Sequence, residues 1–209
     1  MSDYSELYNA ILTGNAKKAE EVTKAALAAK ADPTVLVQQY MIPAMDEVGK
    51  RFECNEYFVP ELLIAARAMK ISLELITPHL TAAGVEPTGR VVIGTVQGDL
   101  HDIGKNLVAS MLEGGGFQVV DLGVDVPPER FVEAAKEKDG TIVALSALLT
   151  TTMTMMKNVI QALDKAGIRT TTKVIIGGAP ITQQYADEIG ADGYSDNASA
   201  AVALARKLA

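Results

Sequence analysis

The sequence predicts an α/β protein in which an N-terminal four-helix bundle is followed by a doubly wound, five-stranded parallel sheet. Two observations support this fold class: apolar residues recur with a helical period up to about residue 80, and from residue 90 strand-like runs alternate with helix-like segments. Between the two patterns, residues 81–89 (TAAGVEPTG) have the composition of a turn or linker. We therefore expect a helical domain at residues 1–88 and an α/β domain at residues 89–209.

Four helices with short connections are expected in the N-terminal half. They are Tyr4–Thr13, a second helix capped by Asn15 that runs to about Ala31, Pro33 to about Arg51, and Pro60 to about Leu80. Gly14 is suited to end the first helix, Asp32 to cap the third, and Pro43 to kink it. The apolar residues of the fourth helix recur every three or four positions, as in a helix packed in a bundle: Leu62, Ala66, Met69, Leu73, Ile76 and Leu80.

Five strand-helix pairs are expected in the C-terminal half. The strands are Arg90–Val96, Phe117–Leu122, Thr141–Leu145, Lys173–Ile176 and Asp192–Tyr194. The helices that follow them are Gly104–Glu113, Pro128–Lys138, Thr152–Ala166, Ile181–Ile189 and Ala198–Leu208. This alternation predicts a parallel sheet with helices on both faces, and such sheets bind ligands at the carboxyl ends of their strands.

Composition excludes several classes of protein. The 209 residues are 48% hydrophobic, enough for a substantial core, and carry a formal net charge of −7, which is the wrong sign for general binding to nucleic acid or to a membrane surface. Cys54 is the single cysteine, and no charged and apolar leader opens the sequence, so we expect a cytoplasmic protein. With only His79 and His101 available, a multi-histidine metal site is not expected.

Three of the loops that follow strands carry residues suited to a metal-cofactor site. Residues 98–106 read GDLHDIGKN, in which Asp99 could bind one ring nitrogen of His101 and leave the other for a metal; alone, this pattern is more often a surface histidine beside a capping aspartate. Residues 146–152 read SALLTTT, and residues 177–179 read GGA. The gap from Gly104 to Ser146 is 41 residues, and the gap from Leu148 to Gly177 is 28. Together the loops fix seven residues at fixed spacing: Asp99, His101, Gly104, Ser146, Leu148, Gly177 and Gly178. Such a set arises by chance on the order of 10⁻⁹ times per starting point.

This constellation resembles the signature of cobalamin-binding domains that hold the corrinoid with its own dimethylbenzimidazole base displaced, as in methionine synthase and several adenosylcobalamin mutases. The helical half is similar to the cap of the methyl-transfer branch, in the segments Val48–Phe52, Tyr57–Glu61 and Ala65–Lys70. The resemblance covers almost the whole chain and is closest to the small corrinoid proteins of anaerobic methyltransferase systems. It implies a Rossmann-like, flavodoxin-like cobalamin-binding domain preceded by a helical cap.

The resemblance also implies a role for each matching residue. His101 would be the lower axial ligand of the cobalt in a base-off, histidine-on complex, and Asp99 and Thr152 would form a relay behind it. Thr152 differs from the family's residue type, and its hydroxyl could cap the following helix, either alone or in addition to the relay. Contacts to a cobalamin or related corrinoid, such as methylcobalamin, are implied for Gly98, Asp99, Leu100, His101, Asp102, Ile103, Gly104, Ser146, Leu148, Thr150, Gly177, Gly178, Ala179 and Tyr194, and for Phe58 in the cap. Tyr194 is equally well explained as a core residue.

The implied function is methyl carriage between enzymes. The cobalt(I) form would accept a methyl group from a substrate-specific methyltransferase, and the resulting methylcobalt(III) would deliver it to a second methyltransferase that acts on tetrahydrofolate or a thiol. A reductive activator is a further implied partner, and the chain alone should turn over nothing. Because the cap cannot both shield the cobalt and admit two partners, residues 81–89 are expected to act as a hinge.

Three alternatives share part of this pattern. A cobalamin-binding subunit of an adenosylcobalamin mutase would share the histidine loop, but mutases generally lack the four-helix cap. A cobalamin-dependent sensor would need a DNA-binding domain, for which two domains in 209 residues leave no room. A cobalamin storage protein remains open. The sequence does not identify the methyl donor, the acceptor or the oligomeric state.

Overall fold

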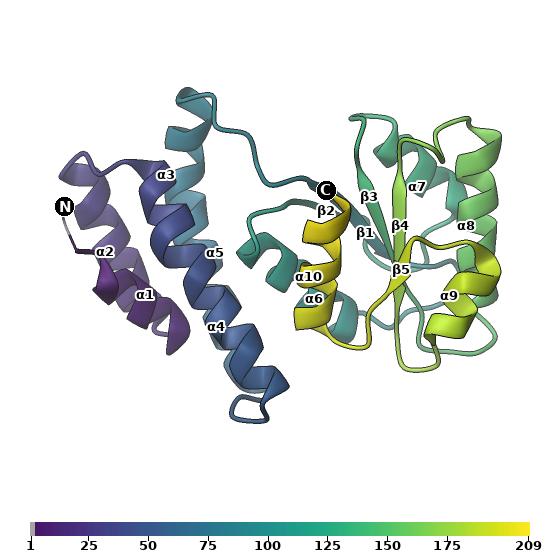
Figure 1. Ribbon diagram of the computed structural model, residues 1–209, viewed down its shortest axis with the longest axis horizontal. Coiled ribbons are helices and arrows are strands. Elements are labelled where there is room, and N and C mark those ends of the chain that lie inside the picture. The colour runs from purple at the N-terminus through teal and green to yellow at the C-terminus, as the bar shows by residue number, and fades with distance from the viewer. Residues whose placement is uncertain (1–2) are drawn as a thin grey trace. The chain divides into compact units, whose positions relative to one another are not determined.

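The computed structural model describes residues 3–209, which form two compact units (Figure 1). The first contains the described residues up to Pro87 together with Glu113–Gly116, and the second contains Thr88–Leu112 and Phe117–Ala209. The expected fold class, helices followed by a five-stranded parallel sheet, is confirmed. No helix within residues 3–209 combines the length and the apolar character needed to cross a membrane.

The N-terminal unit is built from helices. Its helical segments are α1 (Ser5–Leu12), α2 (Ala16–Ala28), α3 (Pro33–Val35), the π-helix η1 (Leu36–Met41), α4 (Ile42–Glu53) and α5 (Val59–Ala82). The caps follow the sequence: the Asn15 side chain accepts the Lys18 N–H, and the Asp32 side chain accepts the Thr34 N–H. Their apolar faces form a core that includes Leu7, Ile11, Leu36, Met41, Leu62, Met69 and Ile76.

The third predicted helix contains a π-helical turn ahead of Pro43. Proline lacks an N–H, and its ring clashes with the carbonyl one turn earlier in a regular α-helix. Here the Ile42 N–H donates to the carbonyl of Val37, five residues back, and Pro43 then lies in the first turn of α4. The wider π turn therefore accommodates the proline, and the kink expected at Pro43 stays a prediction.

Helix α5 differs from its prediction in the buried face and in its end. Leu73 and Leu80 are half-buried, whereas Ser72 is fully buried and its hydroxyl pairs with that of Thr23 at 3.0 Å. The helix also continues to Ala82 with Pro78 inside it, so the non-helical connection begins two residues later than the linker predicted at residues 81–89.

The second unit contains one parallel sheet whose strand order is β2-β1-β3-β4-β5. The strands are β1 (Arg90–Thr95), β2 (Gln118–Asp121), β3 (Ile142–Ser146), β4 (Lys173–Gly177) and β5 (Gly193–Tyr194). All residues of β1 are buried, as expected for a central strand covered on both faces. The strand order reverses between β1 and β3, and this switch point is where a doubly wound fold binds its ligand.

Five helices cover the two faces of the sheet (Figure 1). They are α6 (Ile103–Gly114), α7 (Pro128–Ala135), α8 (Thr154–Lys165), α9 (Gln183–Ile189) and α10 (Ala198–Leu208). Helices α6 and α10 lie on one face, and α7, α8 and α9 on the other. The core between the sheet and the latter three helices includes Val92, Phe131, Val143, Met156, Leu163 and Ile176. Met153 and Met155 pack against this core, so the methionines near the start of α8 serve packing.

Candidate functional site

The strand register brings the three sequence motifs to one edge of the sheet. Thr95, the last residue of β1, pairs with Ser146 at the end of β3, and Ser146 pairs with Gly177 at the end of β4. Three loops therefore leave the sheet side by side: the loop that contains His101 (residues 96–102, the histidine loop), the SALLTTT loop and the GGA loop. The first two flank the switch point between β1 and β3.

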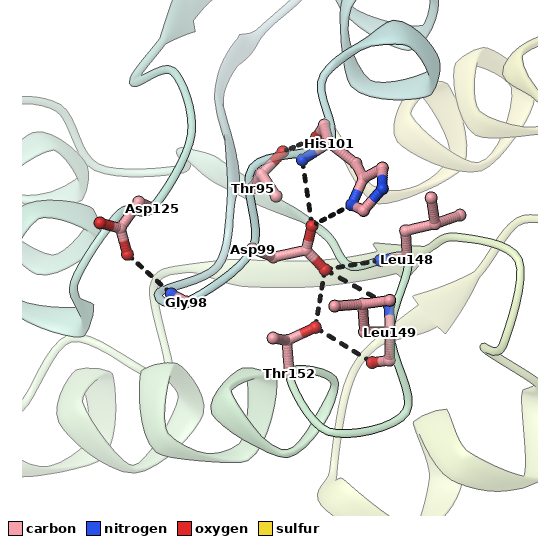
Figure 2. Close-up of polar contacts among 8 residues, drawn as sticks. All are labelled: Thr95, Gly98, Asp99, His101, Asp125, Leu148, Leu149 and Thr152. Atoms are coloured by element: carbon pink, nitrogen blue, oxygen red, sulfur yellow. Dashed lines mark hydrogen bonds and ion pairs between the residues drawn. The ribbon is translucent and has the colours of Figure 1, made fainter.

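Asp99 connects the first two loops and is completely buried. Its Oδ1 accepts hydrogen bonds from Nδ1 of His101 at 2.8 Å and from the His101 backbone N–H at 3.1 Å (Figure 2). Its Oδ2 accepts the Thr152 hydroxyl at 2.6 Å and the backbone N–H groups of Leu148 and Leu149 at 2.8 and 3.3 Å. This single carboxylate thus fixes the histidine and the loop after β3 together.

These donors determine the charge of Asp99. Burial raises the pKa of the carboxyl, but the hydrogen bonds from Thr152, Leu148 and His101 outweigh burial and hold the pKa well below its usual range. An ionised carboxylate only accepts hydrogen bonds, so Nδ1 of His101 carries the ring proton that the neutral imidazole has. The lone pair of Nε2 is then available to a metal.

The surroundings of His101 fit a large, apolar metal macrocycle. The His101 side chain is 52% exposed, and four apolar side chains of the same two loops are also exposed: Leu100, Ile103, Leu148 and Leu149. Leu100 and Ile103, at 72% and 77%, are the most exposed large hydrophobic residues in the described part of the chain. Within residues 3–209 no group of three or more His, Cys, Asp and Glu could hold a metal ion. A metal ligated by His101 therefore needs its other ligands from a cofactor, and a corrinoid supplies them.

The motif glycines are explained by different physical features of their positions. Gly98 has a φ of +84° and Gly178 a φ of +132°, and a Cβ on Gly178 would lie 1.9 Å from the carbonyl oxygen of Ala147. Gly178 is therefore required by the close approach of two loops of the chain itself. Gly104 lies in the first turn of α6, where a Cβ would meet nothing within 4 Å, so the chain itself does not require a glycine there.

The Thr152 hydroxyl serves the site rather than a helix end. Helix α8 begins at Thr154, and its N-cap residue, Met153, receives no side-chain bond. The Thr152 hydroxyl instead donates to Asp99, with the Leu149 carbonyl as a further neighbour at 3.0 Å. The interpretation of Thr152 as a helix cap is therefore wrong.

The structure shows where the other candidate residues lie, but it does not test their contacts with a cofactor. Ser146 is half-buried, Thr150 and Ala179 are exposed in their loops, and Asp102 accepts the side-chain amide of Asn106 at 3.2 Å. Tyr194 packs against the sheet core, as its structural interpretation expected. Phe58 lies in the helical unit at the start of α5 and is 59% exposed. The cofactor contacts assigned to these residues remain predictions.

Two residues that sequence reasoning missed also contact the histidine loop. The Thr95 hydroxyl donates to the His101 carbonyl at 2.7 Å, and the Asp125 carboxylate accepts the Gly98 N–H at 2.7 Å (Figure 2). Asp125 lies in the loop after β2, which neighbours β1 in the sheet. The rule that directed attention to loops after strands could have identified it, since the loop after β2 follows the same rule.

Comparison with known proteins agrees with this geometry. Residues 89–203 match the B12 binding domain family, and residues 4–77 match a second family of the same description. The chain belongs to the B12-binding corrinoid proteins. It is 46% identical to trimethylamine corrinoid protein 1 of Methanosarcina acetivorans over 202 residues, which covers 96% of this chain and 94% of that relative.

Solved structures of similar proteins support the same assignment. A cobalamin-binding protein from Desulfitobacterium hafniense matches with a TM-score of 0.82 and 33% identity over the full length of both chains. A chain of the methanol:cobalamin methyltransferase complex from Methanosarcina barkeri matches with a TM-score of 0.83 and 32% identity, over 95% of this chain and 76% of that one. This corrinoid protein is a methyl carrier of an anaerobic methyltransferase system.

Proposed function

We propose that His101 is the lower axial ligand of the corrinoid cobalt and that the corrinoid binds with its own base displaced. The observation that carries this proposal is the 2.8 Å contact between Nδ1 and Asp99, which leaves Nε2 free on a half-exposed ring at the switch point. Neutral imidazole is a good ligand for a transition metal, and a carboxylate behind it raises its basicity. When bound, the corrinoid supplies a cobalt that accepts a methyl group and gives it to a nucleophile.

The residues of the chain hold the ring proton of this ligand on Nδ1. Asp99 keeps a proton on Nδ1, and Thr152 and the Leu148 N–H keep Asp99 ionised and oriented. Leu100, Ile103, Leu148 and Leu149 offer an apolar rim to the macrocycle.

Three partners complete the proposed cycle in the cytoplasm. A substrate-specific methyltransferase provides the methyl group, a second methyltransferase delivers it to tetrahydrofolate or a thiol, and a reductive activator restores the reduced cofactor. The 46% identity to a trimethylamine corrinoid protein makes a methylamine methyltransferase the first donor enzyme to test.

The test is the absorption spectrum of the protein reconstituted with hydroxocobalamin, followed by reduction to cobalt(I) and addition of methyl iodide. We expect a base-off, histidine-on spectrum and conversion to a stable methylated form. The His101→Ala variant should lose the histidine-on features while still binding corrinoid through the loops. An unchanged spectrum in that variant would contradict the ligand assignment.

A further inference from the structure

The backbone of the histidine loop has its own supports, separate from those of the imidazole ring. Asp99 orients the ring, but a metal ligand on a loop also needs a fixed backbone, because a loop that must be ordered on ligation weakens the metal bond. Residues 96–102 form no helix or strand, and the His101 side chain is half exposed. Two side chains, those of Asp125 and Thr95, hydrogen-bond to the backbone of this segment.

Asp125 supports the first part of the loop through two hydrogen bonds in opposite directions. Its carboxylate oxygen Oδ1 accepts the Gly98 N–H at 2.7 Å, and its own N–H donates to the Asp99 carbonyl at 3.0 Å. Asp125 has a φ of +53°, a left-handed conformation that aspartate tolerates better than most residues. The chain after β2 thus turns so that one residue holds both Gly98 and Asp99.

Thr95 supports the last part of the loop. Its side chain is fully buried at the end of β1, and its hydroxyl donates to the carbonyl of His101 at 2.7 Å. Its backbone is paired as well, because the Thr95 N–H donates to the Gly123 carbonyl and the Thr95 carbonyl accepts the Val126 N–H, both at 3.0 Å. The hydroxyl therefore connects His101 to a strand that is paired on both sides.

We propose that Thr95 and Asp125 are positioning residues that hold the histidine loop in its ligating conformation and so set how strongly His101 binds the cobalt. This inference rests on the proposed role of His101. Neither residue touches the ring or Nε2; both act on the backbone on either side of the ligand, as Figure 2 shows.

The test compares variants that remove each side-chain bond with variants that keep it. Thr95→Val and Asp125→Gly remove the hydroxyl and the carboxylate, and glycine keeps the left-handed backbone accessible at position 125. Thr95→Ser and Asp125→Asn retain a hydroxyl and a side-chain oxygen. Each protein is reconstituted with cobalamin, and the midpoint potential of its cobalt(II)/cobalt(I) couple is measured.

The potential reports histidine ligation because cobalt(I) gives up its lower ligand, whereas cobalt(II) can keep it. Loss of one supporting hydrogen bond should weaken ligation of cobalt(II) about fivefold. For a one-electron couple this raises the midpoint potential by about 40 mV. We expect this rise in Thr95→Val and Asp125→Gly, and potentials close to wild type in Thr95→Ser and Asp125→Asn.

A destabilised control separates positioning from general loss of stability. Arg169 precedes β4, at the opposite edge of the sheet, where its guanidinium contacts the Thr172 carbonyl and Asp192, each at 2.8 Å. Arg169→Ala should lower the free energy of unfolding without moving the potential. Because Asp125 is exposed, its variants should fold even if Thr95→Val does not, and they can decide the proposal alone.

The outcomes distinguish this inference from the proposed function. A potential that differs between wild type and His101→Ala establishes histidine ligation, and wild-type potentials in Thr95→Val and Asp125→Gly would then overturn the positioning role alone. If wild type and His101→Ala share one potential, and neither cobalt(II) form shows nitrogen hyperfine splitting in its electron paramagnetic resonance spectrum, histidine ligation itself is wrong and the inference falls with it.

Discussion

The two oxygens of Asp99 serve two different loops, and this division explains why the residue is a carboxylate. Oδ1 faces His101, and Oδ2 faces Thr152 and the N–H groups of Leu148 and Leu149. Every neighbour can donate, so a group that only accepts is satisfied in full. Asparagine at this position would place its NH2 group, which can only donate, against groups that also donate.

Replacing Thr152 with valine tests the contribution of its hydroxyl. Because the hydroxyl donates to a buried carboxylate, we expect Thr152→Val to lower the free energy of unfolding by about 1–3 kcal/mol, measured by urea unfolding of the corrinoid-free protein. Thr152→Ser should restore most of the loss, and the exposed neighbour variant Thr151→Val should change little. Equal losses in Thr151→Val and Thr152→Val would count against the contact.

Two of the motif glycines, Gly104 and Gly178, give opposite predictions for stability. Gly178→Ala should destabilise the protein severely, since its Cβ would overlap the Ala147 carbonyl at 1.9 Å. Gly104→Ala should fold as well as wild type, because its Cβ enters open space in a helix. If the corrinoid occupies that space, Gly104→Ala binds cobalamin more weakly, which a titration followed by absorbance would show. Wild-type affinity would place the cofactor elsewhere.

The sequence predicted the side chains that bind other side chains or a cofactor, but not those that bind the backbone of the histidine loop. Asp99 and His101 lie two positions apart, and their functional groups complement each other, so the pair was predictable. Thr95 and Asp125 bind a carbonyl and an N–H, which every residue but proline possesses. The rule that ligands bind in the loops after strands indicates the loop that contains Asp125, but only the fold shows which backbone groups these two side chains reach.

At the scale of elements, the strands and helices follow the hydrophobic pattern, but the irregular helix does not. The five strands and the helices after them were predicted to within a few residues, because buried strands and amphipathic helices have distinct periods. The π turn at Leu36–Met41 could not be predicted in this way: the sequence shows that Pro43 cannot continue a regular α-helix, but the hydrophobic period does not show that a π turn precedes it.

Helix α9 is linked to the loop after β3 by the Tyr185 hydroxyl, which donates to the Met153 carbonyl at 2.8 Å. Tyr185→Phe should lower the free energy of unfolding by about 1 kcal/mol at pH 7. Burial, followed by the charge of Glu188, raises the pKa of Tyr185 above its usual value. The contribution of the Tyr185 hydroxyl to the free energy of unfolding is therefore complete below about pH 10. It is lost as the pH rises through the pKa that Tyr185 has in the folded protein.

The measurement for Tyr185 is urea unfolding of wild type and Tyr185→Phe at neutral and at strongly alkaline pH. The difference between the two proteins should shrink at alkaline pH. Tyr8→Phe in α1 is the control for general effects of losing a tyrosine, and its difference from wild type should not follow this course. A Tyr185→Phe difference that stays constant with pH would contradict the role of the hydroxyl.

At the scale of the whole molecule, the chain combines two units of different construction. The helical unit contains Phe58, and the sheet unit contains Asp99, His101 and Thr152. The two are joined by residues 83–89, which form no helix or strand and are mostly exposed. The hinge was expected at residues 81–89. Because α5 continues to Ala82, only residues 83–89 of it lie outside a helix.

Limited proteolysis tests whether this connection is the most accessible part of the chain. We expect subtilisin to cut first within residues 83–89, since cleavage requires an exposed segment without regular hydrogen bonding. Mass spectrometry of the early fragments would locate the cut. First cleavage in the histidine loop, residues 96–102, would contradict both this prediction and the view that the loop is firmly held.

The register of β1, β3 and β4 changes how the spacing of the motifs should be interpreted. Thr95, Ser146 and Gly177 are neighbours because parallel strands end together, so the gaps of 41 and 28 residues reflect only the lengths of the helices, strands and turns that lie between the motifs. An insertion in the turn at Gly167, between α8 and β4, would lengthen one gap without moving the edge of the sheet. Related chains with quite different gaps can therefore carry the same site, and searches for it should fix the strand ends and let the intervals vary.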